Sequence, residues 1–259
     1  MHDNLKNQEA LKLYNEGLNL SKISKKLGIS RSTIRYWTSG KLKNNILKLE
    51  NFNPEKYIIE NKIESVYSYV LGLYLGDGYI NKQGRTYKIR FFLDGKYKTL
   101  NDFVRKNLSL LFPKNSIGTL KTKKINSTDT SMEIISCHNN YITSLFPQHG
   151  PKKKHQRSII LEEWQLKIIE PSYLLTGLFH SDGSYYLNNK TKKNEYSFSN
   201  YSLEIIQIFK NCLEHYNVSN FICKTRINKN IKYQIFVTKK ESVEKLNSLI
   251  GTKNFINLL

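Results

Sequence analysis

The spacing of apolar positions near the amino terminus predicts three short helices. They cover residues 9–16, 21–27 and 31–39, because apolar side chains recur three or four positions apart in each. The apolar faces are formed by Ala10, Leu13 and Tyr14 in the first helix, Ile23 and Leu27 in the second, and Ile34 and Trp37 in the third. We therefore expect a small all-α unit with its own core.

Glycine and serine residues mark the ends of these helices. Gly17 is expected to end the first helix, and Gly28 permits a tight turn after the second, since glycine tolerates positive φ. Ser30 is a favourable N-cap for the third helix. The segment from Leu20 to Trp37 resembles a helix-turn-helix of the resolvase and homeodomain-like kind. That resemblance implies that the third helix lies in the major groove of DNA.

The third helix carries polar side chains opposite its apolar face. They are expected to reach bases or phosphates, and they are Arg31, Ser32, Arg35 and Tyr36. A small three-helix module that binds a protein is the alternative. The charge of the whole chain, described below, favours DNA.

Past residue 62 the chain repeats one pattern. Residues 70–78 read VLGLYLGDG and residues 175–183 read LTGLFHSDG, so apolar residues lead in each copy to a small residue and then to Asp-Gly. The segments after the two copies also match, and each half predicts the order α-β-β-α-β-β-α with the motif on its first helix. Expected elements in the first half are strands at 87–93, 118–124 and 131–137 and helices at 100–111 and 141–146. Those in the second half are strands at 196–199, Phe221–Ile227 and 233–238 and helices at Leu203–His215 and 242–250.

Small residues in the repeated motif predict two closely packed helices. Gly72 and Gly76 are four residues apart, as are Gly177 and Ser181. Residues at this spacing share a helix face, so each helix has a strip with almost no side chain. Two such strips allow the backbones of two helices to approach closely.

An aspartate ends each of these helices. Asp77 and Asp182 are followed by Gly78 and Gly183, which we expect to form left-handed caps. Two carboxylates beside the negative ends of two helix dipoles repel each other, and a hard divalent cation bound by carboxylate and backbone oxygens relieves this repulsion. Such a cation can activate water and neutralise charge on a phosphate. A single Asp-Gly would be only a turn, but two matched copies in a basic protein favour chemistry.

The charge balance points to a polyanionic partner. Lys and Arg number 41 against 21 Asp and Glu, which gives a formal charge of +20 and a pI near 9.7. This surplus attracts nucleic acid at long range, although an AT-rich genome would also supply lysine. With 39% hydrophobic residues the composition excludes a largely disordered chain.

The cysteines and the apolar runs exclude several classes of protein. Cys137, Cys212 and Cys223 form no CxxC pair and are odd in number, which argues against a disulfide framework and against structural zinc. The amino terminus lacks the apolar core of a signal peptide, and no apolar run reaches the ~20 residues that cross a bilayer. We expect a soluble, intracellular, cytoplasmic protein with no membrane partner.

The repeated motif resembles that of the LAGLIDADG homing endonucleases in their single-chain, two-motif form. The resemblance covers about residues 63–259 and is closest to the branch with an N-terminal helix-turn-helix. The residues that carry the branch resemblance are Phe146-Pro-Gln-His-Gly-Pro, Trp164-Gln and residues 177–183. It implies an α+β fold of pseudo-symmetric tandem αββαββα repeats, whose saddle-shaped antiparallel sheets straddle double-stranded DNA.

The same resemblance implies an activity and a cofactor. A monomer with internal pseudo-twofold symmetry would cut both strands across the minor groove, as a site-specific endonuclease. Cleavage would use Mg²⁺ or Mn²⁺ held by the acids Asp77 and Asp182, with oxygens of Gly76 and Ser181 as further ligands.

The sequence departs from the family consensus at the sixth motif position, where Leu75 and His180 replace Asp. That position is not the family's metal ligand. His180 is expected to pack or to face solvent, and contact with DNA or with water near the site is the alternative. The family also places a basic residue near the metal, at the end of a repeat's last strand. Lys239 or Lys240 fits in the second half, and Lys239 is the candidate for this catalytic basic residue; the first half offers Cys137 and His138.

Basic residues on strands and loops predict a DNA-contacting surface. They alternate with apolar residues in two strands, so that one face is charged and points outward. The candidates are Lys88, Arg90, Lys121 and Lys123 on strands and Lys190, Lys192 and Lys229 in loops. The run of residues 152–157 between the two halves is expected to lie along the DNA backbone.

These observations predict the organisation of the chain and leave three functions open. We expect a helix-turn-helix domain at 1–43, a linker with a helical stretch at 44–62, repeats at 63–147 and 171–259, and an inter-repeat linker at 148–170. The alternatives to the endonuclease are a catalytically silent DNA-binding regulator on the same scaffold and an intron RNA maturase. Retention of both Asp77 and Asp182 favours the enzyme.

Overall fold

The computed structural model describes residues 4–40, 51–123, 130–227 and 230–250. The chain divides into two compact units, residues 1–52 and residues 53–259. The predicted linker at 44–62 falls partly outside the described residues, and its later part forms helix α5 (Pro54–Glu60) of the second unit.

The first unit consists of helices α1 (Asn4–Asn15), α2 (Leu20–Leu27) and α3 (Arg31–Thr38). Its core is small and apolar, and the buried side chains are those of Ala10, Leu13, Ile23, Ile29 and Ile34. Gly28 takes φ 64° after α2, and the Ser30 hydroxyl accepts a hydrogen bond of 3.2 Å from the Thr33 amide. The predicted turn and N-cap are therefore confirmed.

One predicted core position of this unit is wrong. Tyr14 is 44% exposed. The chain turns back after Gly17, at φ 88°, and the Leu18 amide bonds the Leu13 carbonyl oxygen at 3.1 Å. Leu18 thereby packs against the core in place of Tyr14.

The second unit contains the two predicted repeats. The first repeat runs α6 (Glu64–Asp77), β1 (Gly78–Gln83), β2 (Thr86–Asp94), α7 (Lys98–Leu111), β3 (Ile117–Lys123), β4 (Thr130–Asn139) and α8 (Ile142–Leu145). The second runs α10 (Pro171–Asp182), β5 (Gly183–Asn188), β6 (Lys193–Asn200), α11 (Leu203–His215), β7 (Phe221–Ile227), β8 (Asn230–Val237) and α12 (Lys240–Leu249). A 3₁₀ turn (Lys154–Gln156) and helix α9 (Glu163–Ile168) lie between them. The predicted order αββαββα is confirmed in both halves.

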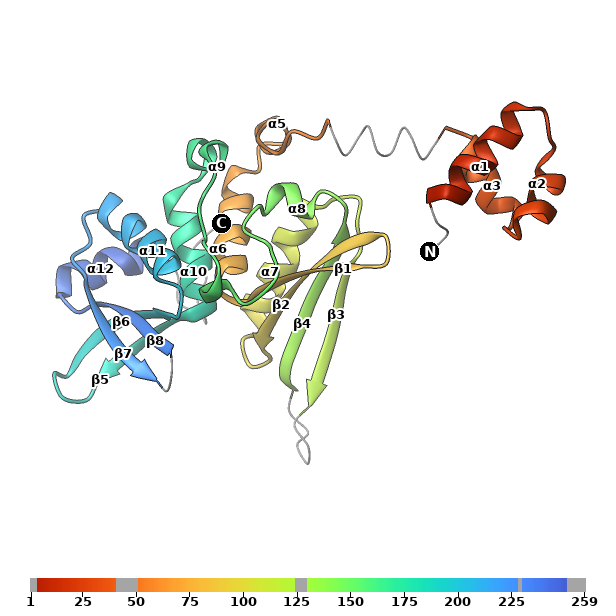
Figure 1. Cartoon of the computed structure of the whole chain (residues 1–259). Coiled ribbons are helices and arrows are strands. Elements are labelled where there is room, and N and C mark those ends of the chain that lie inside the picture. Colours follow the sequence, from red (N-terminus) through yellow and green to blue (C-terminus); the bar gives the residue numbers. More distant parts are fainter. Residues whose placement is uncertain (1–3, 41–50, 124–129, 228–229, 251–259) are drawn as a thin grey trace. The chain divides into compact units, whose positions relative to one another are not determined.

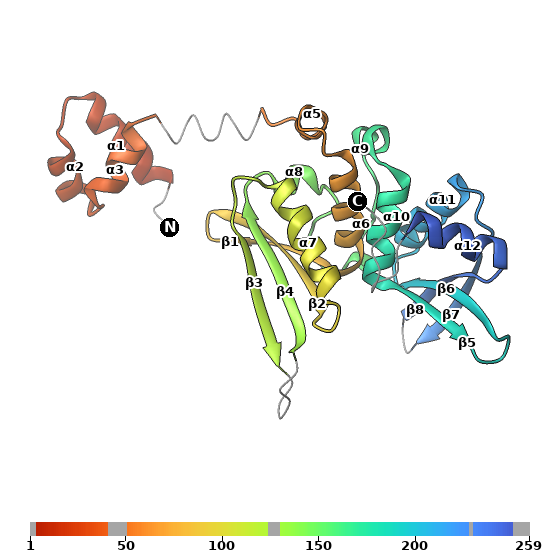
Figure 2. The same cartoon turned by 180° about the vertical axis from the view of Figure 1, so that it is seen from behind.

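Each repeat forms one four-stranded antiparallel sheet. The strand orders are β1-β2-β4-β3 and β5-β6-β8-β7, so the two sheets have the same topology. Helices α6 and α10 stand side by side between the sheets in both views, and the sheets extend away from this pair (Figures 1 and 2). The α+β fold class is confirmed.

Strand register assigns each side chain of the first sheet to one of two faces. Phe91 and Ile135 are paired and fully buried on the face covered by helices. Because directly opposed residues share a face, Lys88 with His138 and Arg90 with Ser136 lie on the other, open face. This confirms the predicted outward direction of Lys88 and Arg90.

Lys121 lies on the opposite face from the one predicted. It pairs with Glu133, which is 3% exposed and receives a hydrogen bond of 2.9 Å from Asn101 on α7. Lys121 therefore lies on the helix-covered face, at the exposed edge strand β3. Alternation along a short strand shows that one face is basic, but it does not show which face the helices cover. Lys123 is paired with Thr130 beyond a register shift.

Candidate active site

Helices α6 and α10 contact each other through their backbones. A Cβ placed on Gly72 would lie 2.8 Å from the Leu178 amide nitrogen, and one on Gly177 would lie 2.8 Å from the Leu73 amide nitrogen. Carbon atoms do not approach nitrogen this closely without repulsion, so any larger residue would push the helices apart. The close packing predicted from the small residues is confirmed.

The two aspartates lie at the neighbouring ends of this helix pair. A Cβ on Gly76 would meet the Ser181 side chain and would lie 3.3 Å from Asp182 Oδ2. The carboxylate of Asp182 thus lies against the residue that precedes Asp77. Both acids are half-buried. The helix packing therefore gathers the two predicted acids at one place.

The glycines after the acids do not form the left-handed caps that the sequence predicts. Gly78 has φ −81° and Gly183 has φ −85°, both in the extended region. A Cβ on Gly78 would lie 2.6 Å from the Tyr74 ring, and one on Gly183 would meet the Phe179 ring. Each helix runs directly into a strand that passes over its last turn. Glycine is therefore needed at both positions because a side chain would overlap the last turn of the helix, and not because φ is positive.

A lysine from the segment between the repeats lies at these helix ends. Lys154 donates hydrogen bonds to the carbonyl oxygens of Tyr74 and Gly76, the latter at 2.8 Å, and its Nζ is 4.9 Å from the centre of the Tyr74 ring. These carbonyls belong to the last turn of α6, where the helix dipole is negative, and the Tyr74 carbonyl also accepts a hydrogen bond from the Gly78 amide. Lys154 thus supplies positive charge where the two acids meet.

The charge of Lys154 is tuned by its surroundings. Its pKa is lowered to about 7, chiefly because the amine is buried and, to a smaller extent, because the guanidinium of Arg157 is nearby. Asp182 and Asp77 both act in the opposite direction, because each carboxylate favours the charged amine. Lys154 is therefore electrostatically coupled to both aspartates.

Asn200 contacts the acid of the second repeat. At the end of β6, its Nδ2 donates a hydrogen bond of 2.7 Å to Asp182 Oδ2, and its Oδ1 accepts from the Ser202 amide at 2.9 Å. Gly78 pairs with Phe91 and Gly183 with Phe198, so Leu93, buried, is the equivalent of Asn200 in the first repeat. The two halves of the site are thus chemically different.

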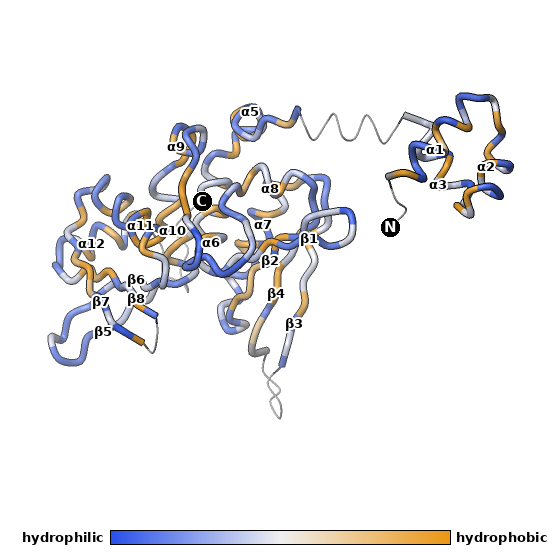
Figure 3. The backbone as a smooth tube through the Cα atoms, in the orientation of Figure 1, coloured by the Kyte–Doolittle hydropathy of each residue, from blue (hydrophilic) through white to orange (hydrophobic). Residues whose placement is uncertain are grey.

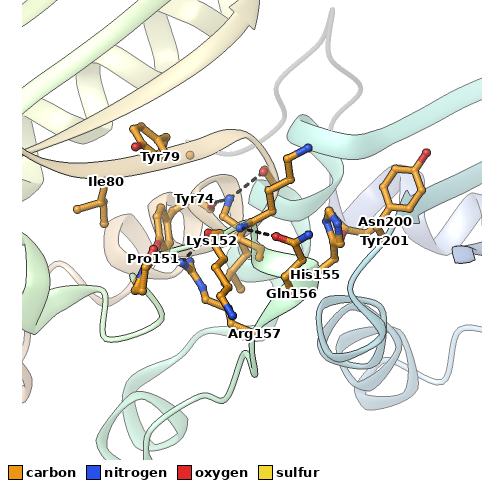
Figure 4. A pocket seen from close by; sticks show the side chains of 16 residues that line it. Tyr74, Tyr79, Ile80, Pro151, Lys152, His155, Gln156, Arg157, Asn200 and Tyr201 are labelled. Carbon is orange, nitrogen blue, oxygen red and sulfur yellow. Dashed lines mark hydrogen bonds between the residues drawn. The ribbon is translucent and has the colours of Figure 1, made fainter. Parts of the chain in front are cut away.

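A cavity of about 560 Å³ opens beside the acids. Figure 4 shows Tyr74, Tyr79 and Ile80 on one side of it and His155, Asn200 and Tyr201 on the other. Arg157 at its base donates a hydrogen bond of 2.7 Å to the Gln148 carbonyl oxygen. The other members of the basic run 152–157 also line the cavity, which therefore suits an anion such as a phosphate.

The donor set at the helix ends fits a magnesium-like ion. Within the ranges that the structure describes, no three His, Cys, Asp or Glu residues gather into a closed metal cluster. Mg²⁺ takes one or two carboxylates together with waters and substrate phosphates, which does not require such a cluster. The carboxylates of Asp77 and Asp182 meet this requirement. The predicted further ligand Gly76 already accepts a hydrogen bond from Lys154, and the Ser181 hydroxyl donates to the Leu178 carbonyl oxygen at 2.6 Å.

The basic residues predicted at the strand ends lie elsewhere. Lys239 is exposed at the N-cap of α12, and Lys240 is 3.9 Å from Glu244 on that helix. Neither makes a contact with an acid of the site in the described part of the chain. Cys137 is buried under the first sheet, whereas His138 is exposed on its open face. The catalytic role of Lys239 stays a prediction.

His180 packs in the interface between the two repeats, as one of its two predicted options. It is 1% exposed, and its Nδ1 lies 3.2 Å from the Tyr69 hydroxyl on α6. The Tyr69 ring is also edge-on to Phe103 on α7. His180 therefore joins α10 to the first repeat.

The remaining candidates for DNA contact lie on exposed surfaces. In the first unit Arg31, Ser32 and Arg35 are exposed on α3, and Tyr36 is half-buried. Lys190 and Lys192 lie in the β5–β6 hairpin, whose tip is hydrophilic in Figure 3. Lys229 lies outside the described residues.

Two domains of the chain match sequence models of known families. Residues 170–251 match the LAGLIDADG-like domain, and residues 2–41 match the Homeodomain-like domain. No curated protein matches the sequence of the chain significantly. Each match covers one part of the chain, the second repeat and the first unit respectively.

Solved structures share the fold of the second unit. The homing endonuclease I-DmoI in complex with DNA and Mn superposes with a TM-score of 0.52 at 14% identity, covering 73% of this chain and 98% of that one. A variant of I-DmoI, in complex with its target DNA in the presence of Mg, superposes with a TM-score of 0.51 at 14% identity. This match covers 74% of this chain and 99% of that one. The homing endonuclease I-WcaI bound to its recognition sequence gives 0.50 at 15% identity over 75% and 88%.

The predicted resemblance is thereby confirmed. The chain carries a homeodomain-like domain followed by a LAGLIDADG fold in its single-chain form, with both motif helices in one polypeptide. None of the helices that the structure describes combines the length and the apolar character needed to span a bilayer.

Proposed function

We propose that this protein is a metal-dependent, site-specific endonuclease that cuts both strands of DNA across the minor groove. One observation carries the proposal. Asp77 and Asp182 end two helices that pack backbone to backbone, and the Lys154 amine is coupled to both. A scaffold that only binds DNA gains nothing from gathering two acids, because they repel phosphates.

The charge of the chain supports duplex DNA as the substrate. A formal charge of +20 favours a polyanion, and Lys88 and Arg90 lie on the open face of the first sheet. The similar structures of I-DmoI and I-WcaI are described as complexes with DNA. One chain supplies both acids, so we infer that the protein acts as a monomer on the two strands.

The acids are the residues that would hold the metal. Asp77 and Asp182 provide carboxylate oxygens, with the backbone oxygens of Gly76 and Ser181 nearby, and the I-DmoI complexes are described with Mn or Mg. A divalent cation there supplies Lewis-acid activation of water and neutralises charge on the phosphate. We assign Mg²⁺ or Mn²⁺ to this role.

Lys154 is assigned to the phosphate. In its charged form Lys154 has three N–H donors, and two of them are used by the carbonyls of Tyr74 and Gly76. The third is available to a group in the adjacent cavity, which Lys154 lines. A preorganised donor aimed at developing negative charge stabilises the transition state without further reorganisation.

The proposal is tested by DNA cleavage. Sites cut by the full-length protein with Mg²⁺ are selected from a randomised DNA library, and Asp77→Asn and Asp182→Asn are then compared with the unmodified protein. Losing a residue that merely orients a metal ligand already costs about 10–100-fold, so each variant is expected to lose more than about 100-fold in cleavage rate. Binding to the selected site is expected to persist, since the substitutions remove negative charge.

Two outcomes would replace the endonuclease with one of its alternatives. Selective binding to duplex DNA without nicking in Mg²⁺ or Mn²⁺ would favour the silent regulator. Preferential binding to a structured RNA over every selected DNA would favour the maturase.

A further inference from the structure

Three apolar side chains form a row across the open face of the first sheet. Phe92 on β2 pairs with Ile134 on β4, which pairs with Leu120 on β3. Phe92 is 39% exposed and Leu120 is 61% exposed, and Ile134 is partly exposed between them. We refer to Phe92, Ile134 and Leu120 as the apolar row. The helices of the repeat do not need it, because Phe91, Ile135 and Leu93 already form their core.

The apolar row begins beside the candidate acid Asp77. Gly78, the residue after Asp77, pairs with Phe91, the residue before Phe92. In the next rows of the same open face, Arg90 pairs with Ser136 and Lys88 with His138. The row therefore adjoins both the acids and the basic side chains of this face.

The equivalent row of the second repeat is polar. Because Phe91 and Phe198 pair with the equivalent residues Gly78 and Gly183, Phe92 corresponds to Ser199. Ser199 pairs with Gln234 and Gln234 with Cys223. There the aromatic pair Phe221 and Phe236 lies one row closer to the β5–β6 hairpin. The sheet architecture thus does not require apolar side chains in this row.

We propose that the apolar row packs against thymine methyl groups in the major groove of the target DNA. This inference rests on the proposed function and adds a determinant of sequence specificity to it. The thymine methyl is the one apolar group that a base pair presents in that groove, and apolar side chains recognise it by contact. An apolar protein partner would bring its surface against Lys88 and Arg90, whereas DNA offers phosphates to those residues and methyl groups to the row.

The test removes single methyl groups from the DNA and leaves the protein unchanged. Full-length protein selects its binding site from a randomised library, and each thymine of that site is then replaced by deoxyuridine. Each methyl group buried by the row is expected to contribute about a fourfold gain in affinity, which its removal abolishes. Affinity is measured by fluorescence anisotropy in Ca²⁺, which replaces Mg²⁺ to prevent cleavage.

Two variants assign the sensitive positions to the row. Leu120→Ala and Phe92→Ala are expected to reduce the deoxyuridine penalty to less than about twofold at the same thymines. Leu120→Ala shortens an exposed side chain on an edge strand, so it leaves the core intact. The matched control is Leu110→Ala on α7, on the other face of the sheet, where the exposed fraction is 47%. This control is expected to keep the full penalty.

The inference is overturned if the selected site contains no thymine, if every replacement leaves affinity unchanged, or if the penalty persists in both row variants. A protein docked on the row predicts the last result. If no selective DNA binding occurs at all, the proposed function fails together with this inference. If binding is selective but one of the results above is found, only this inference fails.

Discussion

Lys154 donates a hydrogen bond of 2.8 Å to the carbonyl oxygen of Gly76, the residue that directly precedes Asp77. Lys154 lies between the two repeats, whereas Gly76 lies in the last turn of the first motif helix. The contact brings a cation from the connecting segment to the negative end of a helix, next to both acids. The connection between the repeats therefore contributes directly to the candidate site.

Replacing Lys154 by methionine is expected to slow cleavage by about 100-fold or more, because the site loses its preorganised donor to the phosphate. Single-turnover cleavage of a saturated complex measures this effect. Lys154→Met also removes the side-chain donor to the Gly76 carbonyl, at a cost to stability of about 1–3 kcal/mol, whereas the Tyr74 carbonyl keeps its hydrogen bond from the Gly78 amide. Thermal unfolding and DNA affinity, measured in parallel, separate lost chemistry from lost structure.

Lys153→Met is the matched control for this experiment. Lys153 is exposed one position earlier, so the variant makes the same substitution in the same segment without touching the helix end. It is expected to weaken binding slightly and to cleave at nearly the unmodified rate. Equal cleavage by Lys154→Met and Lys153→Met would show that Lys154 has no special part in the reaction.

The sequence contains a clear signal for the acids and a weak one for this lysine. Gly72, Gly177 and the two Asp-Gly pairs recur in matched contexts, so periodicity alone predicts a close helix pair with acids at its end. Lys154, in contrast, lies in a run of basic residues that is not part of the repeated pattern and has no periodicity of its own. Its placement depends on how the segment between the repeats folds back on α6, which is a tertiary contact across 78 residues.

Gly72→Ala is expected to destabilise the second unit by about 1–3 kcal/mol or more, because the new methyl group overlaps the backbone of α10. The chain has two tryptophans, Trp37 in the first unit and Trp164 in the second. In a Trp37→Phe background, the fluorescence of Trp164 reports on the second unit alone. Its ring centre is 5.6 Å from that of Tyr67 on α6, so its signal follows this packing. The urea midpoint is the measurement.

Ser65→Ala on the same helix controls for the change of residue type. Ser65 lies in the first turn of α6, where alanine is a better helix former than serine. Its urea midpoint is expected to stay the same or to rise slightly. A Gly72→Ala midpoint equal to that of the control would contradict the close approach of α6 and α10.

Asn200→Asp is expected to slow the cleavage of one DNA strand more than the other. The substitution keeps the acceptor for the Ser202 amide but replaces the donor to Asp182 by a second carboxylate, which repels the first. The equivalent residue in the first repeat is the apolar Leu93, which cannot donate a hydrogen bond to an acid. We therefore expect the substitution at Asn200 to disturb Asp182 more than Asp77. A supercoiled plasmid with the selected site is expected to accumulate as nicked circles.

Asn211→Asp, which adds the same charge on the exposed surface of α11, is the control and is expected to yield linear product without a nicked intermediate. Linear product at the same ratio from both variants would contradict separate roles of the two acids.

The faces of the sheets were only partly predictable from the sequence. Alternation placed Lys88 and Arg90 correctly, because Ile89 between them and Phe91 after Arg90 are fully buried. The same reasoning misplaced Lys121, since β3 is an edge strand on which residues of both faces are exposed. When both faces of an edge strand are exposed, buried and exposed residues no longer alternate, and the sequence does not reveal which face the helices cover.

Arg35→Ala in the helix-turn-helix is expected to lower the salt dependence of DNA binding. Arg35 is exposed on α3, the helix expected to lie in the major groove. Each arginine that neutralises a phosphate contributes about 0.9 to the slope of log affinity against log salt, so a phosphate contact predicts a slope smaller by about 1.

Lys12→Ala removes one positive charge from α1 of the same unit and controls for net charge. If both variants lower the slope equally, long-range attraction accounts for the effect; if only Arg35→Ala does, α3 contacts the DNA backbone. An unchanged slope together with unchanged affinity in Arg35→Ala would instead assign the first unit to a partner other than DNA.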